Sequence, residues 1–86
     1  MTVTFYGNIV KYTNGEKTFI TENHSTFREL LDELSGHYGE EFESLVHGEE
    51  TCLFLVNGKG IALSGGLNTL LTRDDKVEIL PFVDAG

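Results

Sequence analysis

Hydrophobic and polar residues alternate at the start of the chain, a spacing typical of half-buried strands. We expect a first strand over residues 2–11, whose apolar side carries Val3, Phe5 and Ile9. Asn14-Gly15 follows and is a strong hairpin signal, because both residues tolerate positive φ. A second strand is therefore predicted over residues 17–21, with Phe19 and Ile20 as its apolar content.

The pattern then changes to helical spacing. Thr26 can cap a helix, and Glu29 stands three residues later, as a capping box requires. Apolar residues follow at positions that form one stripe facing a sheet: Phe27, Leu30, Leu31, Leu34 and Tyr38. Gly36 and Gly39 predict that this helix ends near them. A second short helical turn is predicted from Phe42, Leu45 and Val46.

The second half of the chain reads mainly as strand. Residues 52–56 form a continuous apolar run that predicts a buried strand, Asn57-Gly58 a turn, and residues 59–63 a short returning strand. A helical turn tucked under the sheet is expected from Leu67, Leu70 and Leu71.

The last predicted strand covers residues 76–80, with Val77 and Ile79 on one face. Pro81 should end it, because proline cannot donate to a ladder. The predicted order is two strands, a helix, two strands, a short helix and a strand. One main helix packed on a mixed sheet of four to five strands, an α+β fold, is the economical way to bury these faces.

Composition narrows the choice of partners. The chain has 86 residues, enough for one domain, with 14 acidic and 6 basic residues and a net charge of −8. This charge argues against nucleic acid and anionic membranes as partners, and it suits a basic protein surface. With Cys52 as the one cysteine and no signal peptide apparent, we expect a cytoplasmic protein.

Three other groups of residues give no sign of a reaction carried out by the chain itself. Cys52 lies in an apolar run, where a cysteine is usually an inert small hydrophobe. The three histidines show no metal-ligand spacing. The glycines near residues 58–60 and 65–66 lack the phosphate-loop pattern, so we expect turns there and no bound cofactor or metal.

The carboxyl end is more informative. After Pro81 a short segment runs to a terminal glycine: Phe82, Val83, Asp84, Ala85 and Gly86. Glycine has no side chain, so its α-carboxylate can enter a narrow active site where a Cβ would clash. We expect a domain over residues 1–81 and a flexible reactive tail over residues 82–86.

Three segments of the chain are informative together. They are Val3-Thr4-Phe5-Tyr6-Gly7, Leu55-Val56-Asn57-Gly58, and the run from Leu70 through Thr72-Arg73-Asp74-Asp75 and Val77-Glu78-Ile79 to Pro81. These segments resemble the MoaD/ThiS family of sulfur carriers, which have the ubiquitin-like β-grasp fold. The third is similar to the family's approach to its reactive tail and is the most specific. Two departures are Asp74, where the family often has glycine, and Ala85, where the family usually ends in Gly-Gly.

The resemblance implies a covalent role for Gly86 and none for a nucleophile of the chain itself. A ubiquitin-activating-like enzyme would use ATP and Mg²⁺ to adenylate the terminal carboxylate, which a sulfur donor would then convert to a thiocarboxylate. The resemblance also implies a partner-binding face near the last strand. Its candidate residues are Phe54, Val56, Leu80 and Phe82, with Val83, Asp84 and Ala85 entering the partner.

Several functions remain open from the sequence. The length and the exit through Pro81 resemble the small subunit of molybdopterin synthase, which works with a larger catalytic subunit. Carriers for thiamine or cysteine biosynthesis would look similar. A protein modifier conjugated through Gly86 would use the same adenylate, and Ala85 favours a third alternative, a non-covalent interaction domain that has lost the reaction.

Overall fold

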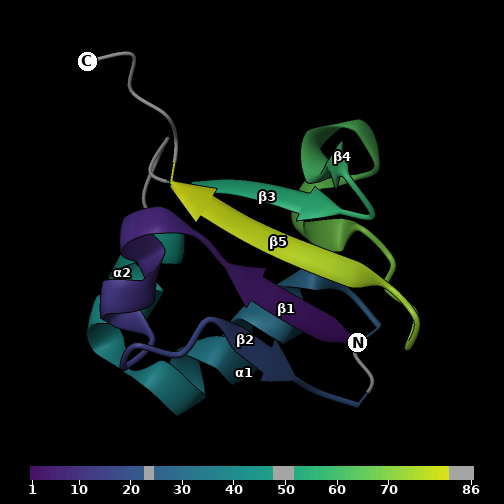
Figure 1. The fold of residues 1–86 in the computed structure, drawn as a ribbon. Coiled ribbons are helices and arrows are strands. Elements are labelled where there is room, and N and C mark those ends of the chain that lie inside the picture. The colour runs from purple at the N-terminus through teal and green to yellow at the C-terminus, as the bar shows by residue number, and fades with distance from the viewer. Residues whose placement is uncertain (23–24, 48–51, 82–86) are drawn as a thin grey trace.

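A five-stranded mixed sheet forms one layer of the protein (Figure 1). The computed structural model describes residues 1–22, 25–47 and 52–81. The strand order is β2-β1-β5-β3-β4, in which the central pair β1 and β5 is parallel and the other pairs are antiparallel. The strands are β1 (Thr2–Phe5), β2 (Thr18–Ile20), β3 (Cys52–Val56), β4 (Lys59–Gly60) and β5 (Lys76–Pro81).

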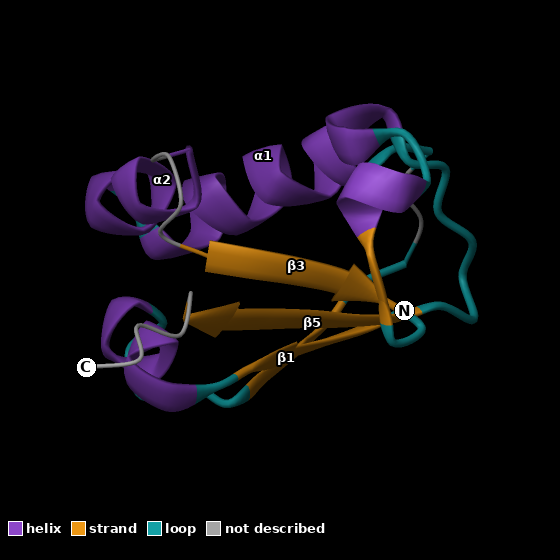
Figure 2. Ribbon diagram, turned by 90° about the horizontal axis from the view of Figure 1, so that it is seen from above, coloured by secondary structure: helices purple, strands orange, loops and turns teal. Residues whose placement is uncertain are grey.

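The two α-helices lie on one face of this sheet (Figure 2). The main helix is α1 (Phe27–Tyr38), and it is followed directly by α2 (Glu40–His47). Three short 3₁₀ helices connect the strands: η1 (Gly7–Tyr12), η2 (Ile61–Leu63) and η3 (Gly66–Asn68). Neither α1 nor α2 lies on the other face of the sheet.

The capping box of α1 is confirmed. The Thr26 hydroxyl accepts from the Glu29 N–H at 3.3 Å, and the Glu29 carboxylate accepts from the Thr26 N–H at 3.2 Å. Such a pair satisfies two backbone donors that a helix start otherwise leaves free. At its other end α1 stops at Gly39, whose φ of 103° suits glycine.

The predicted stripe of α1 forms the core. Its first four members, Phe27, Leu30, Leu31 and Leu34, are fully buried against the inward-facing residues of β1 and β5. Those are Val3, Phe5, Val77 and Ile79. The predicted second helix turn is α2, which adds buried Phe42 and Val46.

The first predicted strand is too long. β1 ends at Phe5, and residues 7–12 form η1, because Gly7 turns the chain with a φ of +58°. Ile9 is buried as expected, but it reaches the core from η1 and not from a strand.

The region after β3 also differs from the prediction. The returning strand covers only Lys59–Gly60, and η2 follows. Leu70 is 76% exposed, although it was expected under the sheet. It pairs with Thr26 in an isolated bridge of extended backbone, where neighbouring side chains point to opposite sides, so Leu71 is buried and Leu70 faces out.

β3 is less buried than its apolar run predicts. Leu53 is 42% exposed, and the other four residues of the strand are half-buried. The reason is that α1 and α2 cover only one face of the sheet. The predicted last strand is present and includes Pro81, one residue more than expected. None of the described helices has the length and apolar character that crossing a membrane requires.

Candidate functional site

The predicted reactive tail, with Gly86, Ala85, Asp84, Val83 and Phe82, lies outside the described residues. The structure does describe the contacts of Pro81, the residue directly before the tail. β5 is paired with β1 on one side and with β3 on the other, and Pro81 stands opposite Cys52. The strand that leads to the tail is therefore central in the sheet and held along both edges.

Gly7 lies directly against Pro81. A Cβ placed on Gly7 would come within 2.9 Å of the Pro81 Cγ atom, closer than side chains pack. The preceding Tyr6 N–H donates to the Ile79 carbonyl at 3.0 Å, which draws the β1 end onto β5. Gly7 thus needs to be glycine for its φ and for its contact with Pro81. The segment that follows β1 and the last residues of β5 therefore meet here.

At the other end of β5, Asn57 links the turn after β3 to the start of the last strand. Its side-chain oxygen accepts from the Lys76 N–H at 3.0 Å, and its side-chain nitrogen donates to Asp75 at 2.8 Å. The backbone of Asn57 has a φ of 53°, a conformation that asparagine tolerates well. Asn57 and Asp75, which belong to two of the family-like segments, are therefore hydrogen-bonded to each other.

The electrostatics of Asp75 agree with this role. Desolvation by burial alone would raise the pKa of Asp75, but hydrogen bonds from the Thr72 backbone and the Asn57 side chain outweigh it and lower the pKa. A carboxyl group whose pKa is lower in the folded than in the unfolded state stabilises the folded protein at pH values above its unfolded pKa. That stabilisation is lost as the pH falls through the folded-state pKa.

We expect Asn57→Gly to lower the free energy of unfolding by about 1–2 kcal/mol, since it keeps the positive φ but removes both side-chain hydrogen bonds. Urea denaturation at neutral pH measures this loss. The matched control is Asn14→Gly, because Asn14 has a similar φ of 56° in an exposed turn. Equal losses in the two variants would contradict the link between Asn57 and β5.

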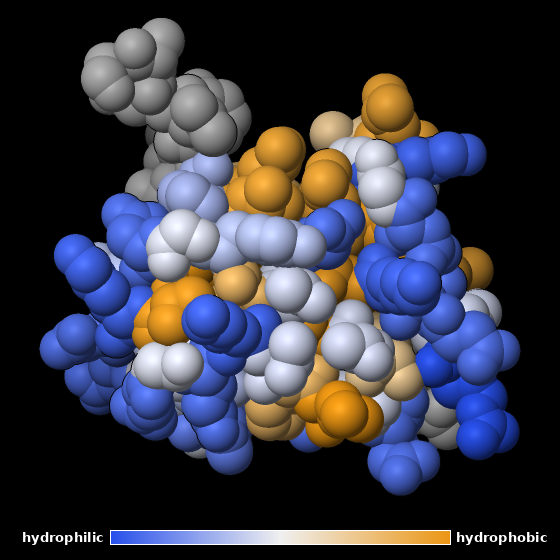
Figure 3. All heavy atoms as spheres, viewed as in Figure 1, coloured by the Kyte–Doolittle hydropathy of each residue, from blue (hydrophilic) through white to orange (hydrophobic). Residues whose placement is uncertain are grey.

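The outer face of the sheet carries an apolar patch beside Pro81. Leu53 stands opposite Leu80 in the pairing of β3 with β5, and Leu55 stands opposite Glu78. Figure 3 shows apolar surface over this part of the sheet among polar neighbours. We name Leu53, Leu55 and Leu80 the outer-face patch.

Tyr6 borders this patch. It is 41% exposed, and its hydroxyl donates to the Glu78 carboxylate at 2.7 Å. That hydrogen bond raises the pKa of the Tyr6 phenol. Tyr6 and Glu78 therefore border the patch and are hydrogen-bonded to each other.

Phe54 and Val56, two of the predicted partner-binding residues, face the other way. Both pack against the core, and the Phe54 ring lies 5.2 Å from that of Phe27. Leu80 alternates with buried Ile79 and lies on the outer face, and its contact with a partner stays a prediction. Sequence reasoning missed Leu53 and Leu55, and the signal that could have found them is the pairing of β3 with the alternating residues Glu78-Ile79-Leu80.

No other chemistry gathers in the described ranges 1–22, 25–47 and 52–81. They contain no group of three histidine, cysteine, aspartate or glutamate side chains that could hold a metal ion. Cys52 is half-buried in β3, with its Sγ 3.8 Å from the Leu45 carbonyl oxygen. What the described part of the chain offers is a last strand paired on both sides up to the start of the tail and an apolar patch on the outer face of the sheet.

A helix packed across a five-stranded mixed sheet of this order defines a ubiquitin-like β-grasp domain. The ThiS family profile matches residues 3–86, nearly the whole sequence. The chain belongs to the ThiS family, the group of sulfur carriers that its motifs resemble. A comparison with curated proteins found no match.

Solved structures agree with this assignment. CysO of Mycobacterium tuberculosis is 26% identical with a TM-score of 0.80, and the alignment covers 95% of this chain and 98% of that one. CysO in the BexX/CysO complex of Amycolatopsis orientalis is 27% identical with a TM-score of 0.82, covering 99% and 98%. The small archaeal modifier protein 1 of Methanosarcina acetivorans shares the fold at 24% identity, with a TM-score of 0.81 and coverage of 99% and 94%.

Proposed function

We propose that this chain carries sulfur as a thiocarboxylate on its terminal residue, Gly86. The observation that carries the proposal is the family match, which covers residues 3–86. The described structure supports it, because the strand before the tail is held on both edges and ends beside an apolar docking patch. The tail itself supplies the reacting group, and the domain presents it.

The chemistry follows from the poor reactivity of a carboxylate, whose negative charge repels nucleophiles. A ubiquitin-activating-like partner attaches AMP from ATP, with Mg²⁺, to the Gly86 carboxylate and releases pyrophosphate. A sulfide then attacks the acyl carbon and AMP leaves, so the thiocarboxylate remains. With a persulfide as donor, the attack gives an acyl disulfide, and a thiol of the sulfur donor then attacks the S–S bond, forms a disulfide with the donor sulfur and releases the thiocarboxylate. Asp84 and Ala85 thread into the partner, and Phe82 and Val83 form the base of the arm. The chain is a co-substrate without catalytic residues of its own.

The adenylation step can be tested alone. Incubated with its activating enzyme, ATP and Mg²⁺, the chain is expected to support exchange of labelled pyrophosphate into ATP. Absence of exchange, with an enzyme shown to activate another carrier, would overturn the proposal. It would instead favour the alternative that Ala85 suggests, a non-covalent interaction domain.

We propose that the activating enzyme binds the outer-face patch. Leu53→Asp would place a charge in this apolar contact, and we expect it to weaken binding of the enzyme by about tenfold or more. Isothermal calorimetry measures the affinity, and circular dichroism confirms that the variant folds.

The matched control is Ile20→Asp. Ile20 is 78% exposed on β2, the edge strand of the same sheet, two strands away from the patch. Equal weakening by both variants would show that general charge repulsion, and not the patch, is responsible.

For the receiving pathway we propose molybdopterin synthesis, with a larger catalytic subunit as the second partner, because of the chain's length and its exit through Pro81. Thiamine and cysteine biosynthesis are the alternatives. Mixing the sulfur-loaded chain with each candidate acceptor enzyme separates them, since only the true acceptor returns Gly86 to a carboxylate. Isopeptide bonds from Gly86 to lysines of other proteins would identify a protein modifier instead.

A further inference from the structure

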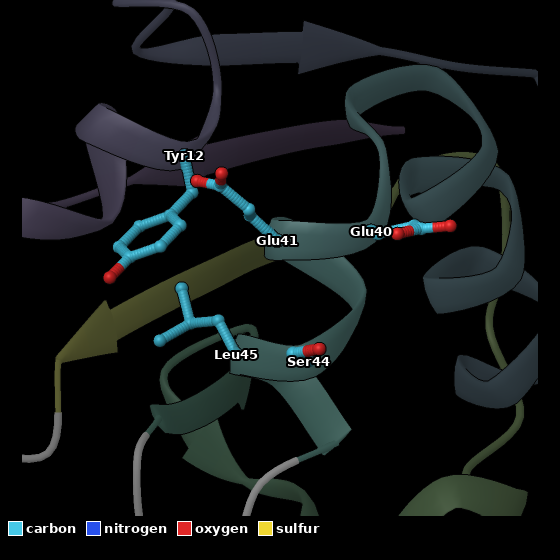
Figure 4. A pocket seen from close by; sticks show the side chains of 5 residues that line it. All are labelled: Tyr12, Glu40, Glu41, Ser44 and Leu45. Carbon is cyan, nitrogen blue, oxygen red and sulfur yellow. The ribbon is translucent and has the colours of Figure 1, made fainter.

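The strand β2 (Thr18–Ile20) forms one edge of the sheet. Among the described strands it pairs with β1 on one side, and none lies on its other side (Figure 1). β2 contributes nothing to the groove that Figure 4 shows, which has a volume of about 550 Å³ and is lined by residues of η1 and α2. What β2 offers to a partner is therefore its backbone and not a cavity.

The residues on either side of β2 direct their backbone groups toward β1. The Lys17 carbonyl accepts from the Phe5 N–H at 2.8 Å. The Thr21 N–H donates to the Met1 carbonyl at 3.1 Å, and the Thr21 carbonyl accepts from the Met1 amine at the same distance. The two ends of the pairing between β1 and β2 are thus fixed.

This pairing decides which groups of β2 are turned outward. In an antiparallel pair, every second residue of a strand directs its N–H and C=O to the neighbouring strand. Phe19 therefore faces β1, as Lys17 and Thr21 do, while the N–H and C=O groups of Thr18 and Ile20 point to the open edge. These outward groups repeat every second residue, which is the spacing that another antiparallel strand requires.

The side chains of this edge also suit a further strand. The four residues from Thr18 to Thr21 are β-branched or aromatic, the types enriched in strands. Natural sheets protect their edges with charged residues or proline, and β2 itself contains neither, since Lys17 comes before it. Ile20 is 78% exposed, so a strand added here would cover apolar surface.

A second copy of this chain is a poor occupant for the edge. The antiparallel register that uses all the outward groups is centred on Phe19, and it would place Glu16 of each copy opposite Glu22 of the other. Like charges directly opposite each other destabilise a strand pair. Each copy also carries a net charge of −8.

Charged groups of both signs lie along the edge. They are the carboxylates of Glu16, Glu22 and Glu33, the Lys17 side chain, the His37 ring beside Glu16, and the Met1 amine beside Thr21. Because these local charges largely offset one another, the net charge of the whole chain decides which segments it attracts, and that charge favours basic ones.

We propose that the open edge of β2 binds an extended, basic segment of a partner protein as an additional antiparallel strand. Main-chain hydrogen bonds to Thr18 and Ile20 supply the affinity, and the alternate side chains of the segment cover Ile20. The outer-face patch lies two strands away, so the two surfaces are separate. The binding needs neither ATP nor chemistry at Gly86, and its test is therefore independent of the sulfur-carrier function.

The experiment is amide hydrogen exchange of the full ¹⁵N-labelled chain with the peptide acetyl-Lys-Thr-Val-Phe-Val-Thr-Lys-amide. In the free chain the amides of Thr18 and Ile20 are expected to exchange at least about tenfold faster than that of Phe19, which is bonded to β1. Saturating peptide is expected to protect Thr18 and Ile20 and to leave Phe19 as it was. An absence of saturable binding, or of protection at Thr18 and Ile20, would overturn the proposal.

Two methylated peptides test the hydrogen bonds on the natural chain. In the proposed register the amides of both valines face β2, so methylating these two nitrogens is expected to weaken binding by about tenfold or more. Methylating the two threonine nitrogens, which face away, is expected to leave the affinity unchanged. An equal or greater loss from the methylated threonines would contradict the added strand.

A matched pair of variants tests the edge from the side of the protein. Ile20→Pro removes one outward N–H and is expected to weaken binding by about threefold or more, whereas Ile20→Val keeps that donor and should bind as the natural chain does. Circular dichroism shows whether both fold. Equal binding by the two folded variants would count against the proposal.

Two further outcomes decide the identity of the occupant. A peptide with glutamate in place of both lysines is expected to bind about threefold more weakly or worse, and equal affinity would overturn the choice of a basic segment. Sedimentation of the chain alone is expected to show a monomer. A dimer in which Thr18 and Ile20 are protected without peptide would mean that a second copy occupies the edge.

Discussion

Deletion of Gly86 is expected to reduce ATP-dependent activation of the chain by at least about a hundredfold, because the reacting carbon no longer reaches its place in the partner. The new terminus would be Ala85, one residue shorter and with a methyl group at the reacting position. Pyrophosphate exchange measures the loss. The domain itself should keep its stability, since its core and its strand β5 end before the deleted residue.

The control for this deletion is Ala85→Gly, which restores the Gly-Gly end usual in the family. We expect it to be activated at least as fast as the natural chain, since it removes a Cβ next to the reacting group. Activation of the deleted chain at the natural rate would show that the adenylate forms elsewhere, and the assignment of Gly86 would be wrong.

The second large effect is on stability. Gly7→Ala is expected to lower the free energy of unfolding by about 2–3 kcal/mol, of which about 1 kcal/mol comes from a side chain at positive φ. The remainder comes from the contact of the new Cβ with the Pro81 ring, at 2.9 Å before any adjustment. Urea denaturation followed by circular dichroism measures the change.

Gly15→Ala separates the two contributions. Gly15 also has a positive φ, +83°, but an added Cβ there meets nothing within 4 Å. It should therefore show the backbone cost alone. Equal losses for Gly7→Ala and Gly15→Ala would mean that the contact between η1 and Pro81 does not hold the end of β5.

The parts of the fold that the sequence predicted correctly depend on local interactions. The capping box of α1 needs only Thr26 and Glu29, and the buried stripe follows from helical spacing. The turns at Asn14 and Asn57 follow from the tolerance of asparagine for positive φ. The order of the strands along the chain followed from the same patterns, and the family resemblance added the β-grasp fold.

The failures involve contacts between distant segments. A continuous apolar run cannot show which face of β3 is buried, and only its pairing with β5 assigns Phe54 inward and Leu53 outward. The early alternation of Val3, Phe5 and Ile9 looked like one strand because a 3₁₀ helix happens to return Ile9 to the same core.

The central claim is that the terminal glycine becomes a thiocarboxylate, and the intact mass of the chain tests it most directly. After incubation with the activating enzyme, ATP, Mg²⁺ and a sulfur donor, the mass should rise by the difference between one sulfur and one oxygen atom. Fragmentation should place that change on Gly86, and Cys52→Ser should show the same shift. An unchanged mass, with the enzyme active on another carrier, or a gain located on Cys52 would contradict the claim.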